Sequence, residues 1–498
     1  MSNKSTSIST LEENICAFFS QYKYILVVSM IIGIYANSVD IFTFKFGIDS
    51  VRFGMDLNGK TYYDQQRYGS YILNNIFPFF RYHIISQITG LLMICLSALL
   101  VISRHNIPYH AKAIFVITIV TFPNFSFLQY FYFQSVYNFI ALLMTVISYK
   151  LIEMNTTKPY NYILSILLLA FAISSYHALF AVFLTVLMIN VLLDFMQGRS
   201  FTDIIKFSII AVLVLIAACC TYYVSILILH DGVLYHYSKY DDSYGTLPIY
   251  QITKNICYYI INTLISKGHY GEHLFLFPAV ILYSIFIIIF IVKNKNLLKT
   301  IQLIVLNILL ILAVFSITIV LGKHVPSRGS LAVGFLFSIY ITIIMIYIKH
   351  KYLKYLMYIF ITYAVLFHTG YISKYYTATM LQYEEDRDIA NHITNMIYKV
   401  APDISSGKYK LAFYGKLHTP QHKRYPLKKG KDVFGASKFM WDNGNPLRMI
   451  WMLYLTGLPT NVKLANAQEM KEQIDSMPSY PSDKCVKVYN DTIIVKLQ

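Results

Sequence analysis

The sequence predicts a polytopic α-helical membrane protein of about eleven spans with a small α/β domain at its C-terminus. The 498 residues are 56% hydrophobic and only 13% charged, which lies outside the usual balance of a water-soluble protein. Apolar stretches long enough to cross a bilayer recur between about residues 24 and 371. After residue 382, charged residues occur throughout and no run of bilayer length remains.

The apolar stretches are separated by short polar turns, which define the individual spans. Their approximate limits are 23–39, 82–103, 112–131, 134–152, 160–175, 177–196, 206–229, 274–292, 299–321, 331–348 and 353–371. Residues 1–21 are polar, contain Glu12 and Glu13, and show no small-residue cleavage pattern, so we expect a retained cytoplasmic tail.

Alternate turns are rich in Lys and Arg, and the positive-inside rule places such turns in the cytoplasm. The basic residues of these turns are Arg104, Lys112, Lys150, Lys158, Arg199, Lys206, Lys293, Lys295, Lys299, Lys349, Lys351 and Lys354. The predicted domains are a cytoplasmic tail at 1–21, a membrane domain at 22–373 and an extracytoplasmic domain at 374–498. The predicted outer loops are 40–81, 230–273 and 322–330. Because the loops 40–81 and 230–273 and the tail are large, whereas the inner turns are short, we expect the chemistry on the outer face.

The net charge of +17 does not indicate nucleic acid, because the basic residues are scattered through the short inner turns. The six cysteines have no metal-ligand spacing, which argues against a zinc site. Cys257 and Cys485 both fall on the predicted outer side, and a disulfide between them stays open. His and acidic residues of loop 230–273 could bind a divalent cation, but they have no recognised ligand spacing, so no metal site is predicted.

The tail has the pattern of a small α/β domain. Residues 386–400 alternate at helical spacing, and Asn445 with Pro446 predicts the N-cap and first turn of a further helix. The predicted strands are 409–414, 461–464, 485–489 and 492–497, the last two joined by a turn at Asn490 and Asp491.

The first outer loop places acids beside cations. Asp49 precedes Arg52, and Asp64 precedes Arg67, by three residues each. A carboxylate near lipid can act as a general base, and guanidinium groups can bind a departing phosphate bidentately. The same spacing also suits local ion pairs on a surface helix, which remains an alternative.

Two further polar sites fall on the predicted outer side. Tyr176 and His177 lie between two apolar runs, where polar side chains are costly unless they face a cavity or find partners. They are therefore candidate pocket residues, with helix capping and packing as the alternative. Lys323, His324 and Arg328 could hold a lipid-linked phosphate or anchor lipid headgroups. No P-loop, G-x-S-x-G or H-E-x-x-H motif occurs, which disfavours ATP-driven transport and the common hydrolase designs.

Three segments, in chain order, resemble the phage-type serotype-converting O-antigen glucosyltransferases of the Gtr type. They are IDSVRF with DQQRYGSYIL in the first outer loop, SSYHALF near the middle, and FGASKFMWDNGNPLRM in the tail. That family carries an acidic pair followed by Arg in the first loop, a Gly-Arg at the start of the next helix, and a central Tyr-Gln. In this chain Ser50 replaces the second acid, Gln66 replaces the Gly before Arg67, and His177 replaces the Gln.

The resemblance implies a GT-C-like fold and an inverting hexosyltransferase of the bacterial inner membrane. Such an enzyme moves a sugar, here glucose by family name, from polyprenyl (undecaprenyl) phosphate to lipid-linked O-antigen of lipopolysaccharide at the periplasmic face. Its first outer loop supplies a catalytic acid, a role that falls on Asp49. The other implied roles are donor phosphate binding by Arg52, Arg67, Lys323 and Arg328, pocket formation by Asp64, Tyr176 and His177, and acceptor contact by Trp441, Asp442, Asn443 and Arg448.

The resemblance also implies the partners. They are membrane lipids, the lipid-linked donor and acceptor, a donor-synthesising transferase and a donor flippase, with a divalent cation as an open cofactor question. An O-antigen polymerase and a non-enzymatic lipid or sugar flippase remain alternatives. A flippase should carry charge along a pathway through the bundle, often with repeat-related halves. Few ionisable residues fall inside the predicted spans, and no repeat is visible.

Overall fold

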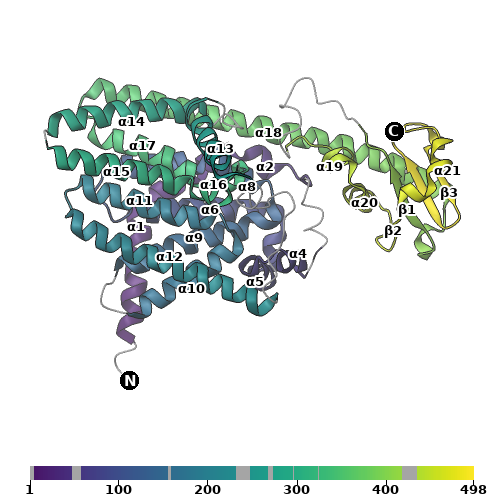
Figure 1. Ribbon diagram of the computed structural model, residues 1–498, viewed down its shortest axis with the longest axis horizontal. Helices are drawn as coiled ribbons and strands as arrows, with labels where there is room; N and C mark the ends of the chain where they lie inside the picture. Colours follow the sequence, from purple (N-terminus) through teal and green to yellow (C-terminus); the bar gives the residue numbers. More distant parts are fainter. Residues whose placement is uncertain are drawn as a thin grey trace. The chain divides into compact units, whose positions relative to one another are not determined.

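The computed structural model describes residues 5–47, 56, 58–154, 159–230, 247–266, 273–294, 296–323, 325–417 and 434–498. The chain forms two compact units (Figure 1). The first contains Met1–Ile41 and Asn58–Ile372, and the second contains Phe42–Leu57 and Ser373–Gln498. Residues 42–57, which the sequence groups with the membrane domain, therefore belong to the same unit as the tail.

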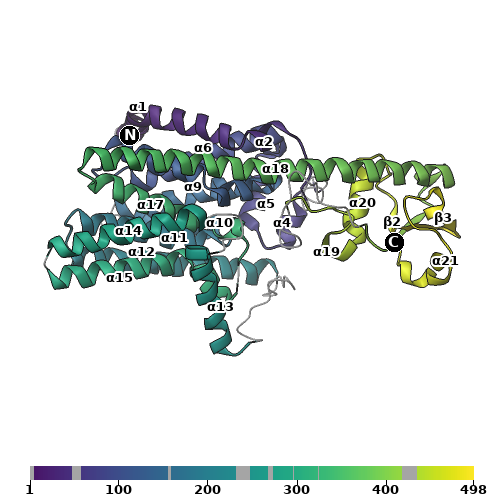
Figure 2. The same ribbon diagram turned by 90° about the horizontal axis from the view of Figure 1, so that it is seen from above.

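The first unit is a helical bundle. Most of its helices run side by side, and α13 runs across them in both views (Figures 1 and 2). Its elements are α1 (Ser5–Ala36), α2 (Ser38–Phe42), α4 (Lys60–Asp64), α5 (Tyr68–Ile76), η1 (Pro78–Arg81), α6 (His83–Ile102), α7 (Tyr109–Val120), α8 (Pro123–Gln129), α9 (Tyr132–Met154), α10 (Pro159–Ser175), α11 (Leu179–Met196), α12 (Phe201–Leu229), α13 (Ile249–Ile261), η3 (Asn262–Ser266), α14 (His273–Asn294), α15 (Leu297–Val314), α16 (Ser316–Leu321), η4 (Ser327–Gly329), α17 (Ala332–Tyr347) and the first part of α18 (Lys351–Val400).

Eight helices of the described chain are long and apolar enough to cross a membrane, by length and composition. The bent pair α7 and α8 would make a ninth span, while α10 and α17 are apolar but shorter. Each of the eleven predicted segments coincides with one of these helices or with a helix pair. The predicted class, a polytopic α-helical membrane protein, is confirmed, and the number of spans stays a prediction.

The third predicted span, 112–131, is broken in the structure. The axes of α7 and α8 differ by 47°. Pro123 is the first residue of α8, and because proline lacks the backbone N–H and clashes with the preceding turn, it cannot continue α7. All seven residues of α8 are buried, so this short helix lies inside the bundle.

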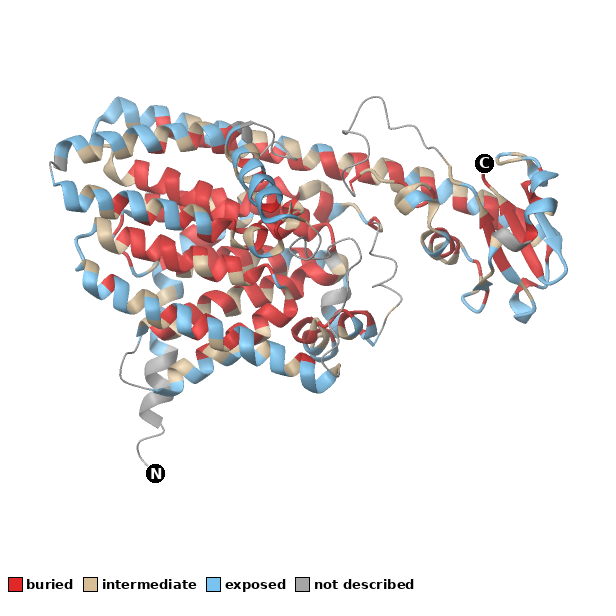
Figure 3. Cartoon of the chain, in the orientation of Figure 1, coloured by how far each residue is buried: buried red, intermediate tan, exposed pale blue. Residues whose placement is uncertain are grey.

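The bundle has an inner and an outer set of helices, which Figure 3 distinguishes by burial. In α11, 78% of the most apolar 18-residue stretch is buried, whereas the buried share of the corresponding stretch is 22% in α14 and 28% in α12 and α15. The outer helices thus present large apolar side chains such as Ile209, Ile288 and Ile308 to their surroundings. Exposure of so large an apolar surface is unfavourable in water but favourable in the hydrocarbon of a lipid bilayer.

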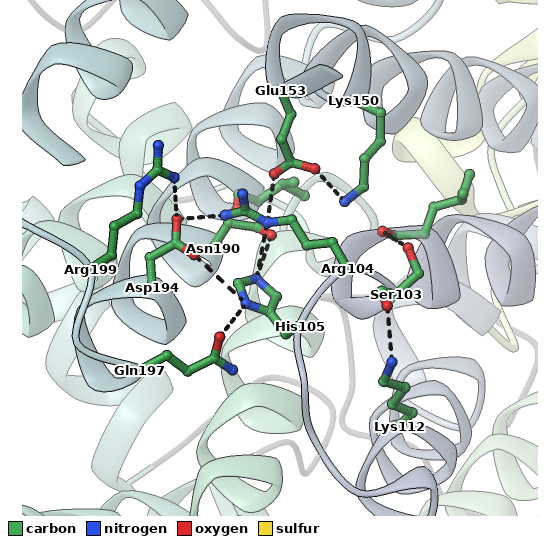
Figure 4. Close-up of polar contacts among 12 residues, drawn as sticks. Ser103, Arg104, His105, Lys112, Lys150, Glu153, Asn190, Asp194, Gln197 and Arg199 are labelled. Carbon is green, nitrogen blue, oxygen red and sulfur yellow. Dashed lines mark hydrogen bonds and ion pairs between the residues drawn. The ribbon is translucent and has the colours of Figure 1, made fainter. Parts of the chain in front are cut away.

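One end of the bundle is joined by an ion-pair network (Figure 4). Arg104, just after α6, contacts Glu153 of α9 at 2.8 Å and Asp194 of α11 at 2.6 Å. Arg199 also contacts Asp194, at 2.9 Å, and Lys150 contacts Glu153 at 2.7 Å. Three turns that the Lys and Arg pattern assigns to one side therefore lie at one end of the bundle. Their assignment to the cytoplasm remains a prediction.

The second unit contains a four-stranded sheet of order β2-β1-β4-β3. Strand β1 pairs in parallel with β2 and β4, and β3 pairs antiparallel with β4. Its elements are the second part of α18, η5 (Ile404–Ser406), β1 (Lys410–Tyr414), α19 (Trp441–Gly444), α20 (Pro446–Leu455), β2 (Lys463–Leu464), η6 (Ala467–Met470), α21 (Lys471–Asp475), η7 (Asp483–Cys485), β3 (Val486–Tyr489) and β4 (Thr492–Lys496).

The core of this unit forms where apolar residues of α18, α20 and the sheet meet, among them Ile393, Leu453 and Ile493. The predicted hairpin is confirmed, and its turn residue Asn490 has a φ of 54°, a conformation that Asn adopts more readily than most residues. The predicted helix start at Asn445 and Pro446 is also confirmed.

The disulfide considered between Cys257 and Cys485 is not formed, since all six cysteines are free. Cys485 is fully buried in the core of the second unit. A thiol enclosed by its own domain cannot meet a distant partner without unfolding that domain, because a disulfide requires a close approach of the two backbones.

Replacing Asn445 by Ala is expected to destabilise the second unit by about 1 kcal/mol. The Asn445 side chain accepts a hydrogen bond from the Leu447 N–H at 3.0 Å, and this N–H has no partner within the helix. Thermal unfolding of the detergent-purified protein measures the loss. Asn445→Asp retains a capping oxygen and should unfold at the wild-type temperature; an unchanged midpoint for Asn445→Ala would contradict the capping role.

Candidate functional site

The end of the first unit opposite the ion-pair network gathers segments that are distant in the sequence. The Tyr62 hydroxyl donates to the Phe133 carbonyl at 2.6 Å, and the Tyr176 hydroxyl donates to the Arg328 carbonyl at 2.9 Å. Further bonds of this kind join Tyr63 to Leu229 and Tyr259 to Val325. All these segments lie in or beside connections that the sequence assigns to the outer side.

Two of the predicted phosphate-binding arginines, Arg67 and Arg328, are neighbours of Tyr176 at this end. Arg67 donates to the Gln134 side chain at 2.8 Å, and its guanidinium carbon lies 5.9 Å from the centre of the Tyr176 ring. The Arg328 guanidinium lies 4.9 Å from the centre of the Phe131 ring. Tyr176 thus contacts Arg67 through its ring and the Arg328 backbone through its hydroxyl. Both arginines are half-buried.

The neighbours of Arg67 leave its charge available. Within the residues that the structure describes, the Arg67 guanidinium contacts an amide oxygen and an aromatic ring, and no carboxylate lies within ion-pair distance. Aromatic faces and amide oxygens stabilise a guanidinium group without neutralising it.

His177 lies in the link between α10 and α11 beside this pair. Its Nε2–H donates to the Tyr222 hydroxyl at 2.7 Å, because that hydroxyl itself donates to the Gln66 carbonyl at 3.0 Å. The His177 side chain is accessible to solvent, so its imidazole can reach a ligand at this end of the bundle.

Close backbone packing holds Arg67 in position. Gly69 of α5 donates its N–H to the Ser174 hydroxyl at 3.0 Å. A Cβ at Gly69 would lie 2.0 Å from Ser175 Oγ and 2.5 Å from the Phe171 carbonyl oxygen. Helices α5 and α10 therefore touch at a point where only glycine fits, which fixes the residues next to it.

A buried polar cluster that the sequence interpretation gave no role lies at the start of the first outer loop. Asp40 is 2% exposed, and its carboxylate accepts from Gln87 Nε2 at 2.7 Å. Gln87 Nε2 also donates to the Gln129 carbonyl at 3.0 Å. Among the described residues, both amide atoms of the buried Gln129 side chain have no hydrogen-bond partner. The sequence signal for this cluster was the position of Asp40, an acid directly after the predicted apolar span 23–39.

The other predicted site residues of the outer loops are placed as follows. Asp49, Arg52 and His324 lie outside the described residues. Lys323 is half-buried and Asp64 is exposed. The alternative of an Asp64 and Arg67 ion pair is wrong: α4 ends at Asp64 and the chain turns at Gln66, whose φ is 58°, so the two residues do not share a helix face.

The predicted acceptor residues lie on a tight turn of the second unit. Asp442 and Asn443 have φ values of 51° and 60°, which is costly for residues other than glycine. Arg448 contacts Asp442 through two nitrogens, at 2.8 and 2.7 Å, and Lys416 donates to Asn443 at 2.6 Å. Trp441 is half-exposed beside them. These contacts support the alternative in which the turn is a structural unit, and acceptor binding stays a prediction.

No group of three His, Cys, Asp or Glu side chains is placed to hold a metal ion in the part of the chain that the structure describes. That part leaves out most of the polar segment between α12 and α13, where Asp231, His236, Asp241 and Asp242 occur.

Fold and site together define a membrane protein in which Arg67, Tyr176 and Arg328 lie at one end of an apolar helical bundle. A family model described as glucosyl transferase GtrII matches residues 39–345, more than half of the chain. The chain belongs to this glucosyltransferase family, and the resemblance seen in the sequence is confirmed. No curated protein and no solved structure matches the chain. The matched region contains Asp40, Arg67, Tyr176 and Arg328, and it ends before the tail.

Proposed function

We propose that the protein transfers a glucosyl residue from a polyprenyl phosphate to O-antigen repeat units at the periplasmic face of the bacterial inner membrane. Membership of the GtrII family supports the glucosyl group and O-antigen modification. The observation that carries the proposal is that Tyr176 contacts the Arg67 guanidinium through its ring and the Arg328 backbone through its hydroxyl, at the end of the bundle that the basic turns predict to be outside.

The arginine pair suits a phosphate that leaves with its lipid. As the bond between the anomeric carbon and the phosphate oxygen breaks, negative charge grows on the phosphate. Guanidinium groups held in a half-buried site stabilise this charge by bidentate hydrogen bonds and by Coulomb attraction that water screens only partly. Arg67, which has no carboxylate neighbour among the described residues, supplies its full charge.

A carboxylate completes the proposed reaction. It removes the proton of an acceptor hydroxyl while the hydroxyl oxygen forms a bond to the anomeric carbon, opposite to the departing polyprenyl phosphate. This single displacement inverts the configuration at that carbon. Asp49 is our first choice for the base, and the buried Asp40 is the competing carboxylate.

The transfer reaction itself tests the proposal. Purified protein in lipid nanodiscs is incubated with polyprenyl-phosphate glucose and lipid-linked O-antigen, and mass spectrometry follows the glycan. We expect one hexose to be added per modified repeat unit without any change in chain length. Longer chains without added hexose would favour a polymerase. A separate assay in proteoliposomes tests for a flippase, which would move the lipid across the membrane without changing the glycan.

Replacing Arg328 by Met is expected to lower kcat/KM for the donor by roughly 10- to 150-fold, since a hydrogen bond to a charged group contributes about 1.5–3 kcal/mol. The fold should survive, because Tyr176 bonds to the Arg328 backbone rather than to its side chain. Initial rates at varied donor concentration measure the effect. Arg387→Met removes an exposed arginine from α18 and serves as the control. Equal donor dependence in both variants would contradict a phosphate role for Arg328.

A further inference from the structure

A buried lysine of the second unit contacts the start of the first outer loop. Lys438 is 3% exposed, and its ammonium donates to the Phe46 carbonyl at 2.8 Å. The two residues are 392 positions apart in the sequence, and both belong to the second unit. Burial of an ammonium group costs free energy, and the hydrogen bond that this group gains goes to a single backbone carbonyl. The position of that carbonyl, at Phe46, therefore matters.

The backbone around Lys438 is fixed by a buried acid of α18. Asp386 is fully buried, and its carboxylate accepts from the Lys438 N–H and from the Ser437 hydroxyl, each at 2.7 Å. Gln382 adds a further hydrogen bond at 3.2 Å. Desolvation raises the pKa of Asp386, while the Lys438 charge and these hydrogen bonds act in the opposite direction. The result is a rigid base from which the Lys438 side chain extends.

Lys438 stays charged at neutral pH despite its burial. Desolvation, and to a smaller extent the positive charge of Arg448, lowers the pKa of Lys438 to about 8, while the negative charge of Asp386 raises it. The ammonium also lies 5.2 Å from the centre of the Tyr383 ring. A charged donor forms a stronger hydrogen bond to a carbonyl than a neutral one, which favours a firm contact with Phe46.

Two aromatic contacts hold the same short segment against α18. The Lys45 ammonium lies 4.5 Å from the centre of the Tyr376 ring, and the Phe46 ring lies 6.2 Å from the Tyr383 ring. Together with the Lys438 hydrogen bond, these contacts fix residues 45 and 46 at three points. Asp49 follows Phe46 by only three residues in the sequence.

We propose that Lys438 is a positioning residue for the first outer loop, holding the backbone at Phe46 so that the following segment, with Asp49, starts from a fixed point. This inference rests on the proposed function, in which Asp49 acts as the base. Lys438 itself contacts no reacting atom. The C-terminal unit would thereby act in catalysis through the loop it holds, although the family match ends at residue 345.

Three variants separate positioning from stability. Lys438→Met removes the hydrogen bond to Phe46. The double variant Lys438→Met with Asp386→Asn also removes the negative charge of Asp386, which the single variant leaves buried without its cation. Ser437→Ala is the control, because it removes one hydrogen bond to Asp386 and leaves the contact with Phe46 in place. We expect kcat to fall roughly 10- to 100-fold in both variants without Lys438, because a displacement of about 1 Å can cost 100-fold in rate. Donor and acceptor KM should not change. Ser437→Ala should lower the thermal midpoint and keep kcat.

Hydrogen–deuterium exchange gives a readout that does not depend on activity. A peptide containing residues 43–47 should exchange faster in both variants without Lys438 and at the wild-type rate in Ser437→Ala. Wild-type exchange and wild-type kcat in the double variant would overturn the inference. Faster exchange with unchanged kcat would also overturn it, because the contact would then be structural only. If the wild type transfers no sugar, the proposed function fails, and the inference about catalysis fails with it even where exchange shows the contact.

Discussion

Asp49→Asn is expected to abolish detectable sugar transfer while the protein stays folded in the membrane. An amide cannot accept the proton of the acceptor hydroxyl, and loss of a general base lowers rates by roughly 100- to 10,000-fold. The substitution preserves size and removes one charge from the predicted first outer loop, so it should not disturb the helical bundle. Single-turnover transfer from polyprenyl-phosphate glucose measures the loss, and the thermal midpoint reports the fold.

Two other acids serve as comparisons for Asp49. Asp203→Asn should keep the wild-type rate, because Asp203 is an exposed acid in the first turn of α12 and has no predicted role at the site. Asp40→Asn tests the competing carboxylate. Loss of transfer in Asp40→Asn together with normal transfer in Asp49→Asn would move the base to Asp40 and end the case for Asp49.

Gly69→Ala is expected to prevent stable folding of the first unit. The new Cβ would lie 2.5 Å from a backbone carbonyl oxygen of α10 as well as 2.0 Å from Ser175 Oγ. The serine side chain could rotate, but the carbonyl moves only with its helix. Overpacking costs about 1–3 kcal/mol and occasionally more, and we expect the upper part of this range. The yield of monodisperse protein and its thermal midpoint measure the effect.

A second glycine offers a matched control for Gly69. A Cβ at Gly370 would meet no atom within 4 Å among the described residues, and Gly370 lies inside α18, where alanine is the better helix former. Gly370→Ala should therefore fold as well as the wild type or slightly better. A normal yield for Gly69→Ala would show that α5 and α10 can separate, and that their contact does not fix Arg67.

The helices were predictable because each depends on local properties. Hydropathy and length identify a bilayer-spanning helix from its own residues, and a capping Asn followed by Pro identifies a helix start. The break between α7 and α8 also had a local signal in Pro123, although the hydropathy of 112–131 alone reads as one continuous span. Tyr176 was singled out by its polarity between two apolar runs, and Arg67 and Arg328 as cations of predicted outer loops. In the structure the Tyr176 ring lies beside Arg67, and its hydroxyl bonds to the Arg328 backbone.

The rest depends on contacts between distant residues. The spacing of Asp64 and Arg67 suggested an ion pair, but spacing has this meaning only on a continuous helix, and the positive φ of Gln66 ends that continuity. Nothing in the residues near Phe46 shows that its partner, Lys438, lies in the tail. Asp40 likewise acquires its buried surroundings only when α6 and α8 pack beside it.

The ion pairs around Arg104 have a consequence for membrane assembly. Arg104 is inserted into the membrane with α6, and its partner Glu153 is inserted with α9. The second partner of Arg104, Asp194, lies at the end of α11. Helices that insert one after another during synthesis first become independent units and associate afterwards. The arginine thus meets its second carboxylate only after the helices from α7 to α11 have been synthesised, so closure of this network marks a late stage in the biogenesis of the bundle.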